Sequence, residues 1–270
     1  MKIFFPQIAQ KTQISHRKGS EMGINRNRII EIDRVDSTNS YAERLRKERK
    51  IPEGTIIWAQ EQTAGKGQGN NVWLSEPSKN LTISMFLYPR FLPVDQQFIL
   101  NKAVSLGVID FVHTILPSGS CKIKWPNDIF YGSSKLGGIL INHSISGNSF
   151  DISIIGIGIN VNQIRFDPSI PHPVSIKQII NNETDMKNAI NSLIMMLDHR
   201  YDQLKKGDLS LLDQEYKKNL LGFDEERRFR KDLDSFIGII RDVDHFGRLI
   251  IETSDYKHLT FSHKEIEFLF

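Results

Sequence analysis

Cysteine is almost absent from this chain of 270 residues, because Cys121 is the only one. An intrachain disulfide is therefore excluded, and a reducing compartment is the better fit. Long apolar runs are missing as well. The longest apolar stretch, residues 152–161, contains Gly156, Gly158 and Asn160 and is too short to cross a membrane as a helix.

The start of the sequence also lacks the pattern of a secretory signal. Its apolar residues Ile3-Phe4-Phe5 are broken at once by Pro6, and no small-residue cleavage site follows. Together with the scarcity of cysteine, this predicts a cytoplasmic protein. The eight histidines show no metal-ligand spacing and no Ser-His-Asp arrangement, and we expect the isolated His143, His172 and His199 to be structural or exposed.

Neither sign of charge dominates, since 35 Lys and Arg face 32 Asp and Glu for a net charge of +3. This balance slightly favours anionic ligands without demanding nucleic acid. The hydrophobic fraction of 39% and the charged fraction of 25% are ordinary for a globular protein. The length predicts one main domain and one small one.

Periodicity divides the chain into three parts. Residues 1–28 are polar and aperiodic, which predicts a disordered extension too irregular for a DNA-binding helix-turn-helix. Residues 29–222 mix helical and strand patterns and form the main domain. Residues 223–270 carry short alternating strands, which predict a small β-barrel.

The same patterns locate individual elements. Helices are predicted over residues 36–50, 95–115, 186–204 and 209–220, with caps at Asp36-Ser37-Thr38 and Asp95. Strands are predicted over residues 55–59, 81–87, 122–125, 136–143 and 150–161. In the last part they are predicted over residues 236–241, 249–253, 259–261 and 266–270.

Glycines alternate with polar residues in the stretch Gly65-Lys66-Gly67-Gln68-Gly69, called the glycine loop below. Such glycines let backbone N–H groups turn toward an anion, and Lys66 adds a charge for a phosphate or a carboxylate. The stretch lacks the Gly-Lys-Ser/Thr of a Walker loop and the following helix of a Rossmann fingerprint. On its own it is more often a mobile surface loop.

Two further stretches carry opposite charges. Lys124-Trp125-Pro126-Asn127-Asp128 ends a predicted strand, and Asp128 there suits Mg²⁺ held through water or a proton taken from an attacking amine. Lys135 precedes Gly137-Gly138, where a fixed cation would neutralise a carboxylate and an α-phosphate together. Taken singly, the first is more often a plain turn and the second a solvated lysine.

Two polar stretches remain. Ser37-Thr38-Asn39 offers hydrogen-bonding groups to a ligand at a helix N-terminus, although simple capping explains it too. Glycines in residues 156–162 would let a ligand ring approach the strand, and Asn160 is able to bind a base edge or a phosphate. A buried central strand with a bulge is the alternative.

In this order, the motifs resemble those of the biotin–protein ligases, also called biotin–[acetyl-CoA-carboxylase] ligases. The matching stretches are Asp36–Asn39, Gln62–Gly67, Trp73, Asn80-Leu81, Ser84, Lys124–Asp128, Lys135–Leu140 and Gly156–Asn160. The resemblance covers residues 29–270 and implies a short form without an N-terminal DNA-binding domain. It implies an α+β fold like that of class II synthetases, in which helices flank a mixed or antiparallel β-sheet over residues 29–222. A small SH3-like β-barrel would follow over residues 223–270.

The resemblance also implies residue roles. Lys135, Asp128 and Lys66 would be catalytic, and Asp128 would also serve Mg²⁺. Biotin would be held by Ser37, Thr38, Asn39, Gln62, Gly65, Lys66, Gly67, Gln68, Lys135 and Gly138. The nucleotide would be held by Lys66, Gln68, Trp73, Lys124, Asn127 and Asn160. Many relatives carry arginines where Lys66, Gln68 and Gly69 stand here.

The implied reaction has two steps and uses ATP, Mg²⁺ and biotin. Biotinyl-5′-AMP forms first, and a lysine of a biotin carboxyl carrier domain then takes the biotinyl group. We expect no nucleic-acid or membrane partner, and a homodimer is an open alternative. A lipoate– or octanoyl–protein ligase and a non-catalytic biotin or nucleotide sensor are the competing hypotheses.

Overall fold

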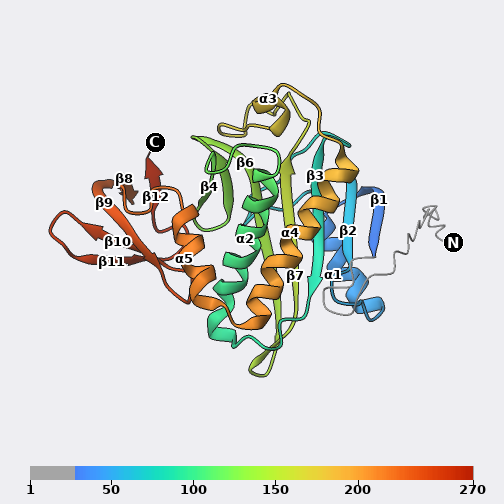
Figure 1. Ribbon diagram of the computed structural model, residues 1–270, viewed down its shortest axis with the longest axis horizontal. Helices are drawn as coiled ribbons and strands as arrows, with labels where there is room; N and C mark the ends of the chain where they lie inside the picture. Colours follow the sequence, from blue (N-terminus) through green and yellow to red (C-terminus); the bar gives the residue numbers. More distant parts are fainter. Residues whose placement is uncertain (1–27, 270) are drawn as a thin grey trace, which may run out of the picture.

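Figure 1 shows a computed structural model of the chain, which describes residues 28–269. The predicted disordered extension lies outside these residues, except for Arg28. Two sheets with helices between and around them make up the described part. The larger sheet belongs to the main domain and the smaller one to the C-terminal part.

The larger sheet has seven strands in the order β1-β2-β3-β7-β6-β5-β4. β1 is parallel to β2, and the other neighbours are antiparallel. The expected mixed sheet is therefore confirmed. The strands are β1 (Ile29–Val35), β2 (Ile56–Gln62), β3 (Asn80–Leu87), β4 (Cys121–Lys124), β5 (Asp128–Tyr131), β6 (Ser134–Ser146) and β7 (Ser149–Asn160).

Helices cover both faces of this sheet. α1 (Thr38–Glu48) packs on one face, and α2 (Gln97–His113) with α4 (Met186–Lys206) on the other (Figure 1). The alternation of side chains along a strand explains both layers. Ile57 and Phe86 pack in the cluster beneath α1, whereas their neighbours Ile56 and Met85 join the cluster of α2 and α4.

The start of α2 differs from the prediction. Asp95 does not cap it, because residues Val94–Gln96 form a 3-10 turn that begins at Pro93. Gln96 is the N-cap instead and makes no side-chain capping bond. The amide of Gln96 donates to the carbonyl of Pro93 at 3.0 Å, so this turn satisfies a donor that a capping side chain would otherwise serve.

The smaller sheet has five antiparallel strands in the order β11-β10-β9-β8-β12. It contains β8 (Glu226–Lys231), β9 (Asp234–Val243), β10 (Leu249–Thr253), β11 (His258–Phe261) and β12 (Glu267–Leu269). Phe229, Ile240, Leu249 and Ile251 are fully buried and belong to the same core cluster as α2. α5 (Leu209–Asn219) lies between this sheet and α2 (Figure 1). The position of the boundary between the two domains stays a prediction.

Four elements were not predicted from the sequence: β1, β5, β8 and α3 (Ile176–Ile180). β5 begins at Asp128, which reads as part of a turn, and β8 has the charged sequence ERRFRK. Both depend on pairing with neighbours rather than on their own pattern. In the described part of the chain, no helix is long and apolar enough to cross a membrane.

Candidate functional site

A pocket lies on the α1 face of the larger sheet, where glycines replace larger side chains. Gly138 of β6 is paired with Gly158 of β7, and Gly156 lies two positions before Gly158 on the same face. A Cβ atom at Gly158 would lie 2.5 Å from the indole ring of Trp73, and one at Gly156 would lie 2.4 Å from Oδ1 of Asn39. Both positions require glycine, and the ring that approaches the strand is the protein's own.

The first turn of α1 supplies the polar end of the pocket. The backbone N–H and the hydroxyl of Thr38 both donate to Oε1 of Gln62, at 2.8 and 3.1 Å. Asn39 accepts a hydrogen bond from the hydroxyl of Ser84 at 2.5 Å. Ser37 is the N-cap of α1 but makes no side-chain capping bond, and it is buried at the pocket wall. Side-chain capping of α1 therefore does not explain its hydroxyl.

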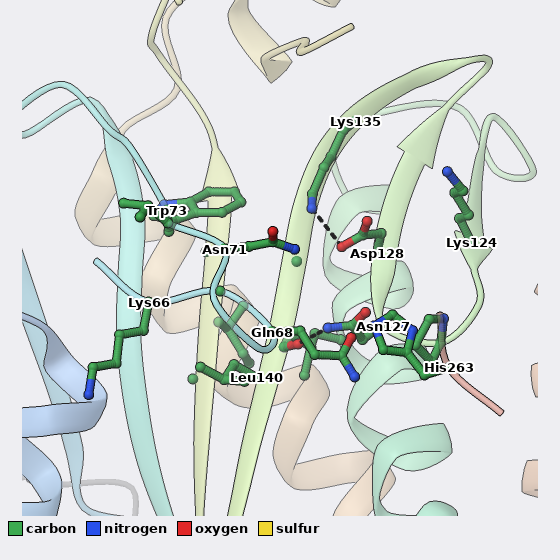
Figure 2. Close-up of a pocket in the computed structure, with 18 of the residues that line it drawn as sticks. Lys66, Gln68, Asn71, Trp73, Lys124, Asn127, Asp128, Lys135, Leu140 and His263 are labelled. Carbon is green, nitrogen blue, oxygen red and sulfur yellow. Dashed lines mark hydrogen bonds and ion pairs between the residues drawn. The ribbon is translucent and has the colours of Figure 1, made fainter. Parts of the chain in front are cut away.

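The glycine loop is folded over the pocket as a narrow hairpin. The amide of Gly67 donates to the carbonyl of Asn71 at 2.8 Å, and the amide of Trp73 donates to that of Gly65 at 2.9 Å. Figure 2 shows Trp73 on the pocket side, whereas the Lys66 side chain extends away from Lys135 and Asp128. Lys66 thus lines the pocket but is not directed at its charged centre.

Asp128 and Lys135 meet in one ion pair. Nζ of Lys135 lies 2.7 Å from Oδ1 of Asp128, and their side chains are 30% and 25% exposed (Figure 2). The β5–β6 hairpin positions them, because Asp128 is paired with Gly138, which has no side chain to separate the two charges. Asp128 was expected to serve Mg²⁺ or the attacking amine, and Lys135 the carboxylate and the α-phosphate. In the structure the two side chains form an ion pair with each other.

Lys124 places a third charge beside this pair, since it is paired with Asp128 in the β4–β5 hairpin. Burial lowers the pKa of Lys124, and the positive charge of Lys135 lowers it further, whereas Asp128 raises it. Its ammonium also lies 4.9 Å from the ring centroid of Phe130. An anionic ligand would relieve the repulsion between the two lysines.

The smaller sheet supplies a wall that the sequence analysis missed. It contributes His263, Lys264, Ile266, Glu267 and Phe268. The imidazole of His263 lies edge-on to Trp125 at 6.1 Å between ring centroids, and burial lowers the pKa of His263. A Cβ atom at Gly69 would lie 2.8 Å from Nζ of Lys264, so the wall contacts the glycine loop. These residues carry no motif of their own, and only the fold brings them to the pocket.

Most of the expected site residues line this one pocket. They are Ser37, Thr38, Asn39, Gln62, Lys66, Gly67, Gln68, Trp73, Lys124, Asn127, Asp128, Lys135 and Gly138. Gly65 and Asn160 are not among its lining residues. Asn160 is buried, and its amide donates to the carbonyl of Val174 at 3.0 Å, which anchors the end of β7. Asn71, Val72 and Leu140 line the pocket without having been expected to.

Two buried polar atoms at the pocket have no hydrogen-bond partner within the described chain: Oε1 of Gln68 and Nε1 of Trp73. Buried polar groups are normally paired, so a bound ligand is the natural partner for such atoms. Residues 28–269 hold no group of three His, Cys, Asp or Glu side chains able to bind a metal ion. Asp128 alone fits Mg²⁺ only if ligand phosphates complete the coordination.

Comparisons with known proteins agree on one family. Residues 31–160 match the family model described as "Biotin/lipoate A/B protein ligase family". The "Bifunctional ligase/repressor BirA" of Bacillus subtilis (strain 168) is 30% identical over 233 residues, which cover 84% of this chain and 70% of that protein. The "Biotin--[acetyl-CoA-carboxylase] ligase" of Mycobacterium tuberculosis is 26% identical and is matched over 74% of each protein.

A solved structure is similar over nearly its whole length. It is titled "Biotin protein ligase from Aquifex aeolicus in complex with biotin and ATP". The TM-score is 0.73 at 25% sequence identity, and the match covers 89% of this chain and 97% of that one. The similarity therefore spans both sheets described above.

Proposed function

Because this chain belongs to the biotin–protein ligases, within the biotin/lipoate A/B protein ligase family, we propose that its pocket joins biotin to AMP and then transfers biotin to a carrier lysine. The acceptor is a lysine of the carrier domain of a biotin-dependent carboxylase. One observation carries the proposal: the Lys135–Asp128 pair and the polar first turn of α1 lie in a single pocket floored by glycine.

The polar first turn of α1 suits the ureido ring of biotin, which has two N–H donors and one carbonyl acceptor. Ser37 and Thr38 carry hydroxyl groups, and Asn39 and Gln62 carry amides, so both kinds of group find partners. Asn39 and Trp73 cover Gly156 and Gly158, so the rest of biotin lies between the first turn of α1 and the Lys135–Asp128 pair. Its carboxylate then points toward Lys135.

In the first step a carboxylate oxygen of biotin attacks the α-phosphorus of ATP. A bond to the α-phosphorus forms, the bond to the bridging oxygen breaks, and pyrophosphate leaves with the electron pair. Two anions must approach each other, and the ammonium of Lys135 reduces their repulsion. Asp128 holds that ammonium in place before the ligands arrive.

The remaining cations fit the phosphates. Lys124 and Lys264 line the same pocket, and the indole of Trp73 offers a flat apolar surface to the adenine ring. Asp128, with the phosphates of ATP, would hold Mg²⁺, which neutralises phosphate charge when bound. Gln68 and Gly69 add no charge to the glycine loop, so retention of the adenylate depends on these lysines.

Mass spectrometry of a carrier domain tests the proposal directly. The purified protein is incubated with the carrier domain, MgATP and either biotin or lipoate. We expect a mass gain of one biotinyl group on the carrier, and only with biotin and MgATP together. Adenylate formation with lipoate alone would replace the biotin assignment, and binding of biotin without any adenylate would indicate a sensor.

Replacement of Lys135 by alanine tests its role. We expect kcat/KM for pyrophosphate release to fall by about 10²- to 10³-fold, because the charge between the two anions is lost. The backbone of Lys135 keeps its bonds to His172 and Val174, so the hairpin is retained. Lys177→Ala is the matched control, since Lys177 pairs with Glu183 outside the pocket. Equal rates for both variants would remove Lys135 from the mechanism.

A cytoplasmic location, the absence of a nucleic-acid partner and the formation of a homodimer stay predictions. Size-exclusion chromatography with light scattering measures the last of these.

A further inference from the structure

A second cavity adjoins the first along one wall. The two share Gln68, Pro126, Asn127, Ile139 and Leu140. The second cavity is completed by Gln97, Phe98, Asn101, Ile141, His143 and Phe246. In Figure 2 its shared residues Gln68, Asn127 and Leu140 lie together at the end of the pocket away from Lys124 and Lys135. The two cavities therefore adjoin at these residues, with Gln68 of the glycine loop on their common wall.

The second cavity exists because the sheet narrows at this place. β5 begins at Asp128, opposite Gly138 of β6. The amide of Ile139 donates to the carbonyl of Asn127 at 2.9 Å. Beyond Ile139, the edge of β6 that faces away from β7 has no strand beside it, and the cavity lies there. Pro126 and Asn127, which directly precede Asp128, thus line both cavities.

The far side of the cavity is fixed by the turn between β9 and β10. A Cβ atom at Gly247 would lie 2.3 Å from the ring of Phe98, so this turn touches the first turns of α2. The carbonyl of Gly247 also accepts a hydrogen bond from Nε1 of Trp125 at 2.9 Å. These contacts hold Phe246, which is 51% exposed, at the rim.

Charge separates the two cavities. In the first, the lysines outnumber the carboxylates, whereas the described residues that line the second include no lysine, arginine or carboxylate. The charged residues of the first are Lys66, Lys124, Lys135, Lys264, Asp128 and Glu267. His143 adds little charge there, because burial lowers its pKa. Phosphates are attracted to the first cavity. A cationic side chain that must reach the same centre is repelled there and passes more easily through the second.

The shared wall also carries the unpaired acceptor. Oε1 of Gln68 is buried and has no hydrogen-bond partner in the described chain. A lysine side chain consists of an apolar stem with a donor head. The apolar residues Phe98, Ile141 and Phe246 suit the stem, and the amide oxygen of Gln68 suits an N–H of the head.

We propose that the second cavity is the route by which the carrier lysine reaches the adenylate, and that Gln68 orients its amine. This inference rests on the proposed function. The neutral amine nitrogen bonds to the carbonyl carbon of biotinyl-AMP, and the bond from that carbon to the phosphate oxygen breaks. AMP leaves with the electron pair, and the proton of the amine passes to solvent. ATP and biotin use the other cavity.

The test fills the second cavity and measures the two steps separately. Asn101→Trp adds a large ring from α2 at a residue outside the first cavity. We expect kcat/KM for the carrier domain to fall by at least about tenfold, the equivalent of one lost contact. Pyrophosphate release with biotin and MgATP should change by less than about twofold. Hydroxylamine, which is small enough to bypass the ring, should still cleave the adenylate.

Asn191→Trp is the matched control, because Asn191 is an exposed asparagine of α4 that lines neither cavity. A second variant, Phe246→Ala, should raise KM for the carrier more than kcat, with Tyr256→Ala as its control because Tyr256 is 84% exposed on another turn. Transfer to the carrier at the control rate in both Asn101→Trp and Phe246→Ala would overturn the route. Absence of adenylate in the unaltered protein would instead overturn the proposed function.

Discussion

At the residue scale, the pocket depends on side chains that are missing as much as on those that are present. Gly156 and Gly158 leave space that Asn39 and Trp73 occupy. The sequence pattern correctly indicated a close approach to this strand, but not that a protein ring makes it. The reason is that Trp73 reaches β7 only when the glycine loop is folded.

Gly158→Ala is expected to displace Trp73 and raise KM for ATP by about tenfold or more, because overpacking of this size costs about 1–3 kcal/mol. kcat should change less, since Lys135 and Asp128 are untouched. Steady-state kinetics of pyrophosphate release measure both constants. In a Trp73→Ala background the added methyl group meets no ring, so Gly158→Ala should then have little further effect on KM. Equal effects in the two backgrounds would contradict the contact.

Asp36 directly precedes Ser37, the N-cap of α1, and forms an ion pair with Arg44 of the same helix. Arg44 donates to both carboxylate oxygens, at 2.7 and 2.8 Å, and this lowers the pKa of Asp36 to about 2. A carboxyl with a lowered pKa stabilises the folded state above its unfolded pKa and loses that contribution as the pH falls. The window therefore runs from about pH 4 down to about pH 2.

Asp36→Asn should reduce the free energy of unfolding by about 0.5–1 kcal/mol at pH 7, because the pair is largely exposed. Urea unfolding of both proteins should show this difference shrinking as the pH falls from about 4 toward 2. Asp185→Asn is the control. Asp185 is a carboxylate at the N-terminus of α4 whose capping bond comes from a backbone amide, so it tests whether any carboxylate at a helix N-terminus gives the same pH dependence. A difference between wild type and Asp36→Asn that does not depend on pH would exclude the ion pair as its cause.

At the element scale, long periodic segments were predictable and short paired ones were not. α4 and β3 lie where their patterns placed them, because each buries a continuous apolar surface. β5 has four residues and is stable only between β4 and β6. The motif around Asp128 could be identified from the sequence. Its ion pair with Lys135 could not, because that contact forms only when β5 and β6 pair as a hairpin.

Gly207→Ala is expected to destabilise the end of α4. Gly207 has φ of +83°, and a Cβ atom added there would meet no atom within 4 Å, so backbone conformation alone sets the cost. Alanine should lower the free energy of unfolding by about 1–2 kcal/mol, and Gly207→Asn should cost less, because asparagine tolerates this conformation better. Denaturant unfolding ranks the two. The opposite order would show that a contact rather than φ decides.

At the scale of the whole molecule, one buried lysine links α2 to α5 and to the smaller sheet. Lys102 of α2 is 5% exposed and donates to Asp213 of α5 at 2.5 Å and to the carbonyl of Val243 at the end of β9 at 2.8 Å. Both partners lose a donor if Lys102 is removed. The smaller sheet would then be held mainly by apolar contacts.

Lys102→Met should lower the free energy of unfolding by about 2 kcal/mol, because Val243 loses its donor while Asp213 keeps Lys217. Limited proteolysis between α5 and β8 should accelerate, and KM for ATP should rise because residues 263–268 line the pocket. Lys187→Met, at an exposed position of α4, is the control. Unfolding and proteolysis equal to this control would show that the ammonium does not hold the sheet.

The wall made by residues 263–268 bears on the order of events during synthesis. Every other lining residue of the pocket is translated before them, with more than a hundred positions between Gly158 and His263. Until residues 263–268 are in place, the pocket has the first turn of α1 and the Lys135–Asp128 pair but an open side toward the glycine loop. The pocket is therefore completed only when the smaller sheet docks on the larger one.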